Sequence, residues 1–259
     1  NLEYDIAKLM YHDYKKGREN IFKNITFDYK SVPKKLTLEK IKTNSQKLIK
    51  NYEIFTKIEL EKKYQHQFLL HHHQNTNLFP TEVIPFEEEY YITEGENTKK
   101  FKLDNNGRID CIFYSITKEN KLTDLYLIEI KVDDKVIDAK NQPGILEHLQ
   151  DINTLMTNQE LKSYFLTTLI DNINYRRETL GEKRIVEEKV KIHFYTVIGF
   201  TSALERTKVE QKINNPKYKA KLEFLMNEIK EECDGKIFFD LLNWNPEDEH
   251  CPFQYKRVL

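Results

Sequence analysis

The sequence predicts an α/β (α+β) fold in which helices pack on a central mixed β-sheet. Two observations support this class. Short runs rich in β-branched and aromatic residues fill the middle of the chain, and segments with apolar residues at helical spacing lie before and after them. This order is typical of helices packed on one sheet. No linker or internal repeat divides the 259 residues, so we expect a single domain over 1–259.

The first part of the chain, residues 1–74, is predicted to be helical. Residues 36–70 contain no Gly or Pro, and their apolar residues recur at helical spacing. The apolar positions are Ile41, Leu48, Tyr52, Phe55 and Ile58. Pro80 lies just beyond this block, and the composition changes after it. We therefore expect an N-terminal helical part followed by a sheet.

The middle of the chain is predicted to form an antiparallel meander. Short apolar or aromatic runs occupy 83–86, 89–92, 101–103, 109–116 and 125–132. Turn signals lie between them, above all the Asp-Asn-Asn-Gly sequence at 104–107 and the polar segment 117–124. Strands that follow one another through such short turns pair antiparallel.

The last part of the chain is predicted to alternate between helix and strand. A helix begins after Pro143 and Gly144, and helical sequence continues to about residue 179. Its apolar stripe consists of Ile145, Leu149, Ile152 and Met156. A strand at 192–200, a charged helix at 218–232 and an apolar strand at 237–242 complete the expected order.

The composition excludes several functional classes. The seven glycines stand too far apart for a phosphate-binding GxGxxG or GxxxxGK[ST] loop, which argues against Rossmann and P-loop nucleotide chemistry. The three cysteines show no CxxC spacing, so neither a zinc ribbon nor a disulfide framework is indicated. No apolar run is long enough to span a membrane and no signal peptide is visible, so we expect a cytoplasmic protein. The chain begins at Asn1 without Met, which leaves open a larger chain or complex.

The 41 Lys and Arg residues nearly balance the 42 Asp and Glu residues, giving a formal net charge of −1. The two signs are distributed unevenly along the chain. Residues 82–138 are rich in acidic side chains, whereas the N-terminal helical part and residues 176–184 lean basic. This distribution is compatible with a basic rim around an acidic centre, which a protein needs in order to hold a polyanion over bound cations.

Charged residues occur inside two apolar strands that we expect to be neighbours. Asp110 lies at the start of the first strand, and Glu129 and Lys131 lie in the second. Residues two apart in a strand point to the same face, so Glu129 and Lys131 should be side by side. Burying ions is costly unless they are paired or bind a metal. Asp110 and Glu129 could bind Mg²⁺ or Mn²⁺, and Lys131 could orient a water molecule or stabilise negative charge.

These residues resemble the core motif of the PD-(D/E)xK nucleases. Gly107-x-x-Asp110 is followed 19 residues later by Glu129-x-Lys131 on a strand. Gln150 in the next helix is similar to the extra glutamine of the RecB-like and lambda-exonuclease-like branch, although Thr154 stands where that branch usually has an aromatic residue.

The resemblance implies a restriction-endonuclease-like core over 82–200 and a Mg²⁺- or Mn²⁺-dependent deoxyribonuclease. It implies metal ligands at Asp110, Glu129 and Ile130, a catalytic Lys131 and an accessory Gln150. In such families an upstream helix often adds a Glu or His to the metal site. Three residues are candidates for this role, and the sequence does not choose among them: Glu59, Glu61 and His66.

Several residues outside the motif could contact a nucleic acid, for which DNA is the expected partner. Arg108, Arg176 and Arg177 are candidate phosphate contacts. Tyr90, Tyr91 and Tyr114 could stack on unpaired bases, although core packing is the expected role for most of them.

We expect an exonuclease or processing nuclease. A sequence-specific restriction endonuclease and a non-catalytic nucleic-acid-binding protein on the same fold stay open, as does an ordinary strand with Glu129 and Lys131 on a solvated face. The sequence does not determine strandedness, DNA against RNA, or oligomeric state.

Overall fold

The computed structural model describes residues 60–71, 78–79, 82–93, 100–101, 103, 107–133, 144–241, 244–245 and 253–259. The chain divides into two units, Asn1–Ile58 and Glu59–Leu259, and all described residues belong to the second. The single domain that we expected over 1–259 stays a prediction, because residues 1–59 lie outside the described residues. Most of the helical segment predicted over 1–74 lies outside the described residues, and its described end is helix α3, Leu60–Leu70.

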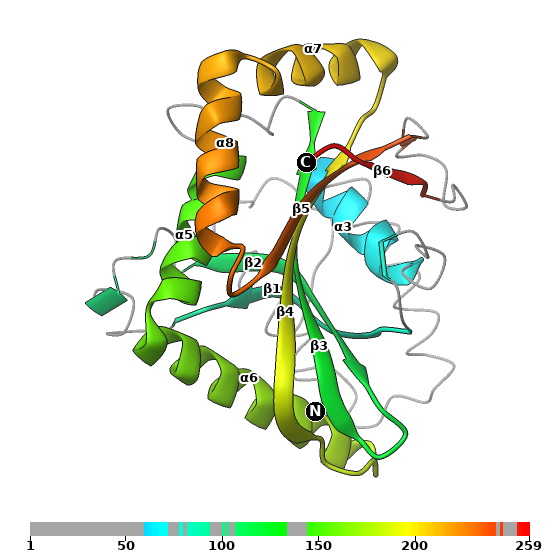
Figure 1. Ribbon diagram of the computed structural model, residues 1–259. Helices are drawn as coiled ribbons and strands as arrows, with labels where there is room; N and C mark the ends of the chain where they lie inside the picture. The colour runs from blue at the N-terminus through cyan, green and yellow to red at the C-terminus, as the bar shows by residue number, and fades with distance from the viewer. Residues whose placement is uncertain are drawn as a thin grey trace, which may run out of the picture. The chain divides into compact units, whose positions relative to one another are not determined.

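The described strands form one six-stranded mixed sheet in the order β1-β2-β3-β4-β5-β6 (Figure 1). The first three strands pair antiparallel, as the predicted meander requires; β3, β4 and β5 are parallel to one another, and β6 is antiparallel to β5. The strand bounds are Ile84–Tyr91 for β1, Arg108–Ile116 for β2, Lys121–Val132 for β3, Val186–Gly199 for β4, Asp234–Asp240 for β5 and Tyr255–Arg257 for β6. The predicted α/β class with a mixed sheet is therefore confirmed.

Two pairs of helices make the crossovers that parallel strands require. The chain passes from β3 to β4 through α5 (Ile145–Thr157) and α6 (Gln159–Thr179), and from β4 to β5 through α7 (Ala203–Ile213) and α8 (Pro216–Ile229). Asn158 separates α5 from α6, because its side chain caps α6 by accepting a hydrogen bond from the Leu161 N–H at 3.1 Å.

Two local predictions differ from the structure. The runs at 83–86 and 89–92 belong to one strand, β1, in which Glu89 adopts a left-handed conformation with φ of 56°. The expected strand at 101–103 is wrong, since Lys100 and Phe101 are helical. The hydrophobic pattern of so short a segment does not distinguish a strand from a helical turn.

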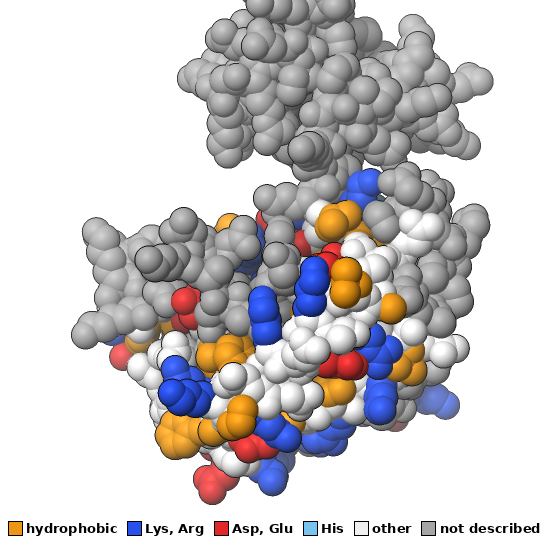
Figure 2. Space-filling model, turned by 90° about the horizontal axis from the view of Figure 1, so that it is seen from above, with side chains coloured by type: hydrophobic (Ala, Val, Ile, Leu, Met, Phe, Trp, Pro, Cys, Tyr) orange, Lys and Arg blue, Asp and Glu red, His pale blue; other side chains and the backbone are white. Residues whose placement is uncertain are grey.

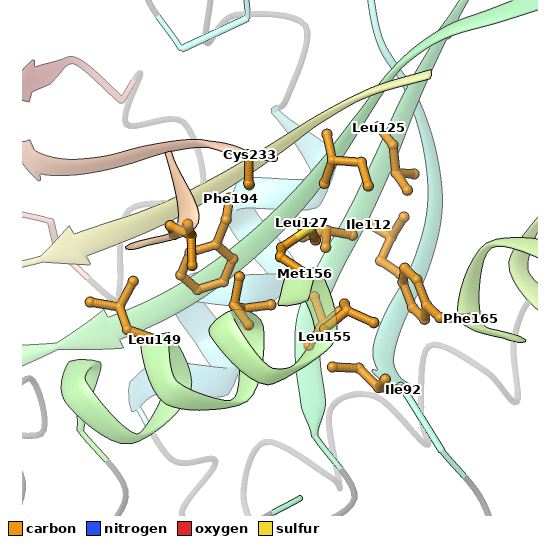
Figure 3. Packing of buried hydrophobic residues seen from close by; sticks show 14 of the residues in the cluster. Ile92, Ile112, Leu125, Leu127, Leu149, Leu155, Met156, Phe165, Phe194 and Cys233 are labelled. Carbon is orange, nitrogen blue, oxygen red and sulfur yellow. The ribbon is translucent and has the colours of Figure 1, made fainter. Parts of the chain in front are cut away.

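Both faces of the sheet are covered. Helices α5, α6 and α8 lie on one side and α3 lies on the other (Figure 1). On the first side Leu127 of β3, Phe194 of β4 and Leu149 of α5 belong to one hydrophobic cluster (Figure 3). On the second side Tyr64 and Phe68 of α3 pack on the sheet. A polar side chain in the middle of β3 is therefore buried whichever way it points.

Helix α3 lies so close to β4 that adding one methyl group at Gly199 is expected to destabilise the protein. A Cβ atom at Gly199 would overlap the Tyr64 ring, whose Cζ atom would be only 2.8 Å away. We expect Gly199→Ala to lower the free energy of unfolding by about 1–3 kcal/mol, as overpacking does. Urea denaturation measures this change. Gly235→Ala is the control, because its Cβ would meet the movable end of Ile229 at 3.2 Å; equal losses in the two variants would contradict the explanation.

Candidate active site

The candidate site lies where β2 and β3 separate. Their ladder pairs residues up to Cys111 and Ile128. Beyond this pair, Oδ2 of Asp110 accepts a hydrogen bond from the Ile130 N–H at 2.8 Å, so a side chain takes the place of a ladder contact. The N–H and C=O groups of one strand residue point to the same side. The carbonyl of Ile130 therefore faces the gap that Asp110 occupies.

Glu129 and Lys131 lie side by side in β3, as predicted. Leu125 and Leu127 point to the same face of β3 as Glu129 and Lys131, and they pack in the hydrophobic cluster under α5 and α6. Glu129 and Lys131 therefore lie on this buried face of the sheet. The exposed fractions of Glu129 and Lys131 are 1% and 3%, which excludes the solvated face that the sequence left open. Lys131 Nζ lies 2.6 Å from Glu129 Oε1.

Helix α3 adds an acidic residue to the site. Glu61 Oε1 lies 3.8 Å from Lys131 Nζ, and Glu61 is itself buried. Of the other two upstream candidates, His66 is exposed and Glu59 lies outside the described residues. Glu61 is thus the described upstream residue that reaches the site, through the lysine.

Helix α5 contributes a histidine that the sequence analysis did not select. His148 Nε2 lies 3.0 Å from Glu129 Oε1. The sequence contained the information needed to select His148. This residue stands three residues after Ile145 and four before Ile152, so it lies along the apolar stripe of the helix. Gln150, the predicted accessory residue, is exposed, and no hydrogen bond or ion pair joins its side chain to Asp110, Glu129 or Lys131. The histidine therefore takes the place expected for the glutamine.

Burial and charge set the protonation of the site. Burial, reinforced by the charge of Glu129, raises the pKa of Asp110 to about 8. Burial also opposes ionisation of Glu129, but His148 and Lys131 outweigh it and lower its pKa to about 2. Burial likewise opposes the charge on Lys131, yet Glu129 and Asp110 raise its pKa above the ordinary value. At neutral pH the protein alone holds a neutral Asp110 beside an ionised Glu129 and a charged Lys131.

One oxygen of Asp110 has no hydrogen-bond partner among the described residues. This atom, Oδ1, is buried, and Arg108 Nη2 lies 3.8 Å from it. A buried polar atom without a partner costs free energy and usually has a functional reason. Two carboxylates and the Ile130 carbonyl form a set of hard oxygen donors of the kind that Mg²⁺ or Mn²⁺ prefers. These residues therefore fit a divalent cation.

The cation would have few protein ligands. Among the residues that the structure describes, no group of three or more His, Cys, Asp or Glu side chains is arranged to hold a metal. The set of two carboxylates and one carbonyl agrees with this finding, because Mg²⁺ usually keeps several waters and is bound through one or two carboxylates and substrate phosphates.

The three arginines selected from the sequence have different surroundings. Arg108 is half-buried at the border of the site, near Asp110 and 3.4 Å from Glu89 Oε1. The assignment of Arg177 to nucleic-acid binding is corrected, because this side chain is buried and donates to the Lys183 carbonyl at 2.7 Å and to Asn120 Oδ1 at 2.9 Å. Asn120 lies at the opposite end of β3, about 25–30 Å from Glu129 along the strand. Arg176 is half-exposed and donates to the carbonyl of Phe86.

On the face seen in Figure 2, acidic and basic side chains are interspersed over the described residues. The expected basic rim stays a prediction, because most of the basic N-terminal part lies outside the described residues.

No protein-family model matches the chain. The searches of curated proteins and of solved structures also found no match. Among the described helices, none is both long and apolar enough to cross a membrane.

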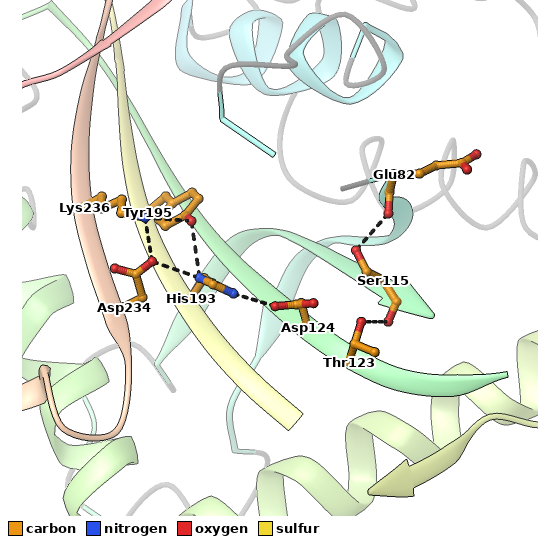
Figure 4. Close-up of polar contacts among 8 residues, drawn as sticks. All are labelled: Glu82, Ser115, Thr123, Asp124, His193, Tyr195, Asp234 and Lys236. Carbon is orange, nitrogen blue, oxygen red and sulfur yellow. Dashed lines mark hydrogen bonds and ion pairs between the residues drawn. The ribbon is translucent and has the colours of Figure 1, made fainter. Parts of the chain in front are cut away.

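A second polar cluster lies on the α3 side of the sheet. The ring of His193 is stacked on Tyr126 and connects two strands: Nε2 lies 2.9 Å from Asp124 Oδ1 and Nδ1 lies 3.2 Å from Asp234 Oδ2 (Figure 4). Lys236 completes the cluster, 2.6 Å from Asp234. His193 is buried, and both of its ring nitrogens have hydrogen-bond partners. These contacts indicate a structural role, in which His193 of β4 connects β3 with β5.

Removal of this connection is expected to affect stability and not cleavage. We expect His193→Leu to lower the free energy of unfolding by about 1–3 kcal/mol, because it leaves Asp124 without its partner. Urea denaturation measures the loss, and His66→Leu at an exposed position is the control. Loss of cleavage in a folded His193→Leu protein would contradict the structural role.

Proposed function

We propose that the chain is a metal-dependent nuclease that hydrolyses phosphodiester bonds, with DNA as the expected substrate. The observation that carries the proposal is the buried convergence of Asp110, Glu129 and Lys131 where β2 and β3 separate. Beside the Glu129–Lys131 ion pair, Oδ1 of Asp110 is buried and has no hydrogen-bond partner among the described residues, which favours a ligand at this atom.

Each residue of the candidate site has a separate role in the proposed reaction. Asp110, Glu129 and the Ile130 carbonyl would hold Mg²⁺ or Mn²⁺, which when bound supplies Lewis acidity and a water of lowered pKa. Lys131 keeps its proton because its pKa is raised, so its role is to stabilise the negative charge that develops on the phosphoryl oxygens. His148 and Glu61 hold the Glu129–Lys131 pair in place from two helices. Arg108 lies beside Asp110, where it can contact a neighbouring phosphate.

Neither a non-catalytic binding protein nor a restriction endonuclease is favoured over this proposal by an observation on the site. A non-catalytic binding protein on this fold needs no intact set of Asp, Glu and Lys, yet all three are present and adjacent. A restriction endonuclease would share the same site and differ in its products, because it would cut closed circular DNA into discrete fragments. A processing exonuclease would require an end.

The decisive experiment is a cleavage panel. Linear duplex, circular duplex, single-stranded DNA and RNA are incubated with Mg²⁺, Mn²⁺ or EDTA, and products are resolved on gels. We expect cleavage with either metal and none with EDTA or with Asp110→Asn. Glu228→Gln, in an exposed Glu-x-Lys sequence of α8, is the matched control and should cleave normally. A folded protein that cuts no substrate with either metal would overturn the proposal.

A further inference from the structure

A groove of about 460 Å³ lies between helix α6 and β1, the first strand of the described sheet. Tyr91 lines it from β1, and Tyr164, Thr168 and Asn172 line it from α6. Tyr91 is 42% exposed, which is a high exposure for so large a ring on a strand.

The backbone of β1 explains why one strand supplies so many lining residues. Successive side chains of a regular strand alternate between its two faces. Glu89 has a left-handed φ of 56°, and the residues that follow it, Tyr90 and Tyr91, both line the groove. A non-glycine residue held in this conformation is strained, and such strain is concentrated at functional sites.

The groove is connected to the candidate site by direct contacts. Glu89 lines the groove and lies 3.4 Å from Arg108, which lies 3.8 Å from Asp110. Tyr91 pairs with Arg108 across β1 and β2. From strand spacing and rise, the backbones of Tyr91 and Asp110 are about 8 Å apart. A nucleotide adjacent to the one at the carboxylates can therefore place its base in the groove.

The charges of the groove are compatible with a nucleic-acid strand. Its two described acidic lining residues both have cationic partners: Glu89 lies 3.2 Å from Lys62 Nζ, and Glu87 lies 3.5 Å from Arg176 Nη2. The remaining polar side chains are an amide and hydroxyls, which can bond to base edges. The Asn172 amide already donates to the Tyr90 hydroxyl at 3.2 Å, which fixes the position of both groups.

We propose that this groove binds one unpaired base beside the scissile phosphate, so that the preferred substrate is a single strand or an unpaired end. The inference rests on the proposed nuclease function and adds the substrate class. A base inside a duplex is stacked on both faces and paired at its edge, so it cannot enter a side groove. Tyrosine rings stack on any base, which predicts binding with little sequence preference.

Fluorescence of a single-stranded oligonucleotide containing 2-aminopurine tests the groove without cleavage. The oligonucleotide is titrated with protein in EDTA, because stacking on a tyrosine quenches this base analogue. We expect quenching by the unaltered chain, and roughly tenfold weaker binding with little quenching for Tyr91→Leu and Tyr164→Leu. Tyr91→Phe keeps the ring and should restore quenching. Tyr175→Leu, 75% exposed on the same helix but outside the groove, should bind normally.

The outcomes separate this inference from the nuclease proposal. Tyrosine-dependent quenching supports the groove even if no substrate is cut, in which case the nuclease proposal alone fails. Normal binding and cleavage of single strands by folded Tyr91→Leu and Tyr164→Leu proteins would overturn the groove and leave the nuclease proposal standing. Equal affinity for a blunt duplex and a single strand would also overturn it. Circular dichroism confirms that each variant is folded.

Discussion

The Asp110→Asn variant is expected to lose cleavage and to be more stable than the unaltered protein at neutral and alkaline pH. Cleavage should fall by a factor on the order of 10³ or more, because an amide does not replace a carboxylate as ligand and charge. The gain in stability follows from the buried position of the carboxyl group, whose pKa is raised to about 8. An asparagine can still accept the Ile130 N–H without carrying a charge.

The sign of the pH dependence follows from the direction of this shift. A carboxyl group with a raised pKa keeps its proton in the folded state after the unfolded chain has released it. The stability of the unaltered protein therefore falls as the pH rises from about 4 to about 8, while the amide of the Asp110→Asn variant would contribute no such change. Each pKa unit corresponds to about 1.4 kcal/mol, and structural relaxation reduces the full effect, so we expect about 1–3 kcal/mol at the upper end.

Urea denaturation at several pH values between about 5 and 8.5 measures this difference. The control is Asp171→Asn on the exposed face of α6, which should change neither the stability nor its pH dependence. An Asp110→Asn protein that is less stable than the unaltered chain at the highest pH would show that the carboxylate is ionised and well paired. That result would contradict the protonation state derived from the structure.

Lys131→Met is expected to lose cleavage with the opposite effect on stability. Removal of the ammonium group leaves Glu129 buried with His148, whose pKa is raised mainly by the charge of Glu129 against the effect of burial, as its remaining close partner. Breaking a buried ion pair by removing one partner typically costs about 3–5 kcal/mol, and the histidine places this site near the lower value. Cleavage should fall by about 10²–10³, the usual loss when a group that stabilises developing charge is removed.

A double-mutant cycle checks the origin of the destabilisation. Glu129→Gln combined with Lys131→Met removes both charges, so the double variant should regain much of the stability that Lys131→Met lost. Urea denaturation of the four proteins gives the coupling energy, and cleavage should be strongly reduced in all three variants. If the losses of the two single variants simply add, the 2.6 Å contact contributes nothing and the explanation fails.

The elements in which apolar residues recur with a clear strand or helix period were predicted well. The alternation in β2 and β3 placed Glu129 and Lys131 on one face and the start of β2 beside them, and the structure agrees. Helix α7 was missed because its sequence is strongly polar and it buries only Val209 and Ile213. Such a helix carries almost no apolar stripe, so its sequence gives little signal.

The site was predicted in part, because sequence gives the face of an element but not what that face meets. Asp110, Glu129 and Lys131 lie together as expected. The choice of Gln150 over His148 depended on a family resemblance, whereas the helical stripe already favoured the histidine. Arg177 has the same side chain as Arg176 and neighbours it in sequence, yet tertiary contacts bury one and leave the other half-exposed.

The separation of β2 and β3 gives the site a built-in spectroscopic reporter. The amide hydrogen of Ile130 is held by a carboxyl oxygen instead of a carbonyl of the ladder, although it lies in the interior of a buried strand. Its exchange with deuterium should therefore follow the state of Asp110, while the amides of neighbouring paired strands follow the stability of the sheet. A ligand that binds the Asp110 carboxyl group would change the exchange rate of the Ile130 amide, so its binding could be measured without any cleavage of substrate.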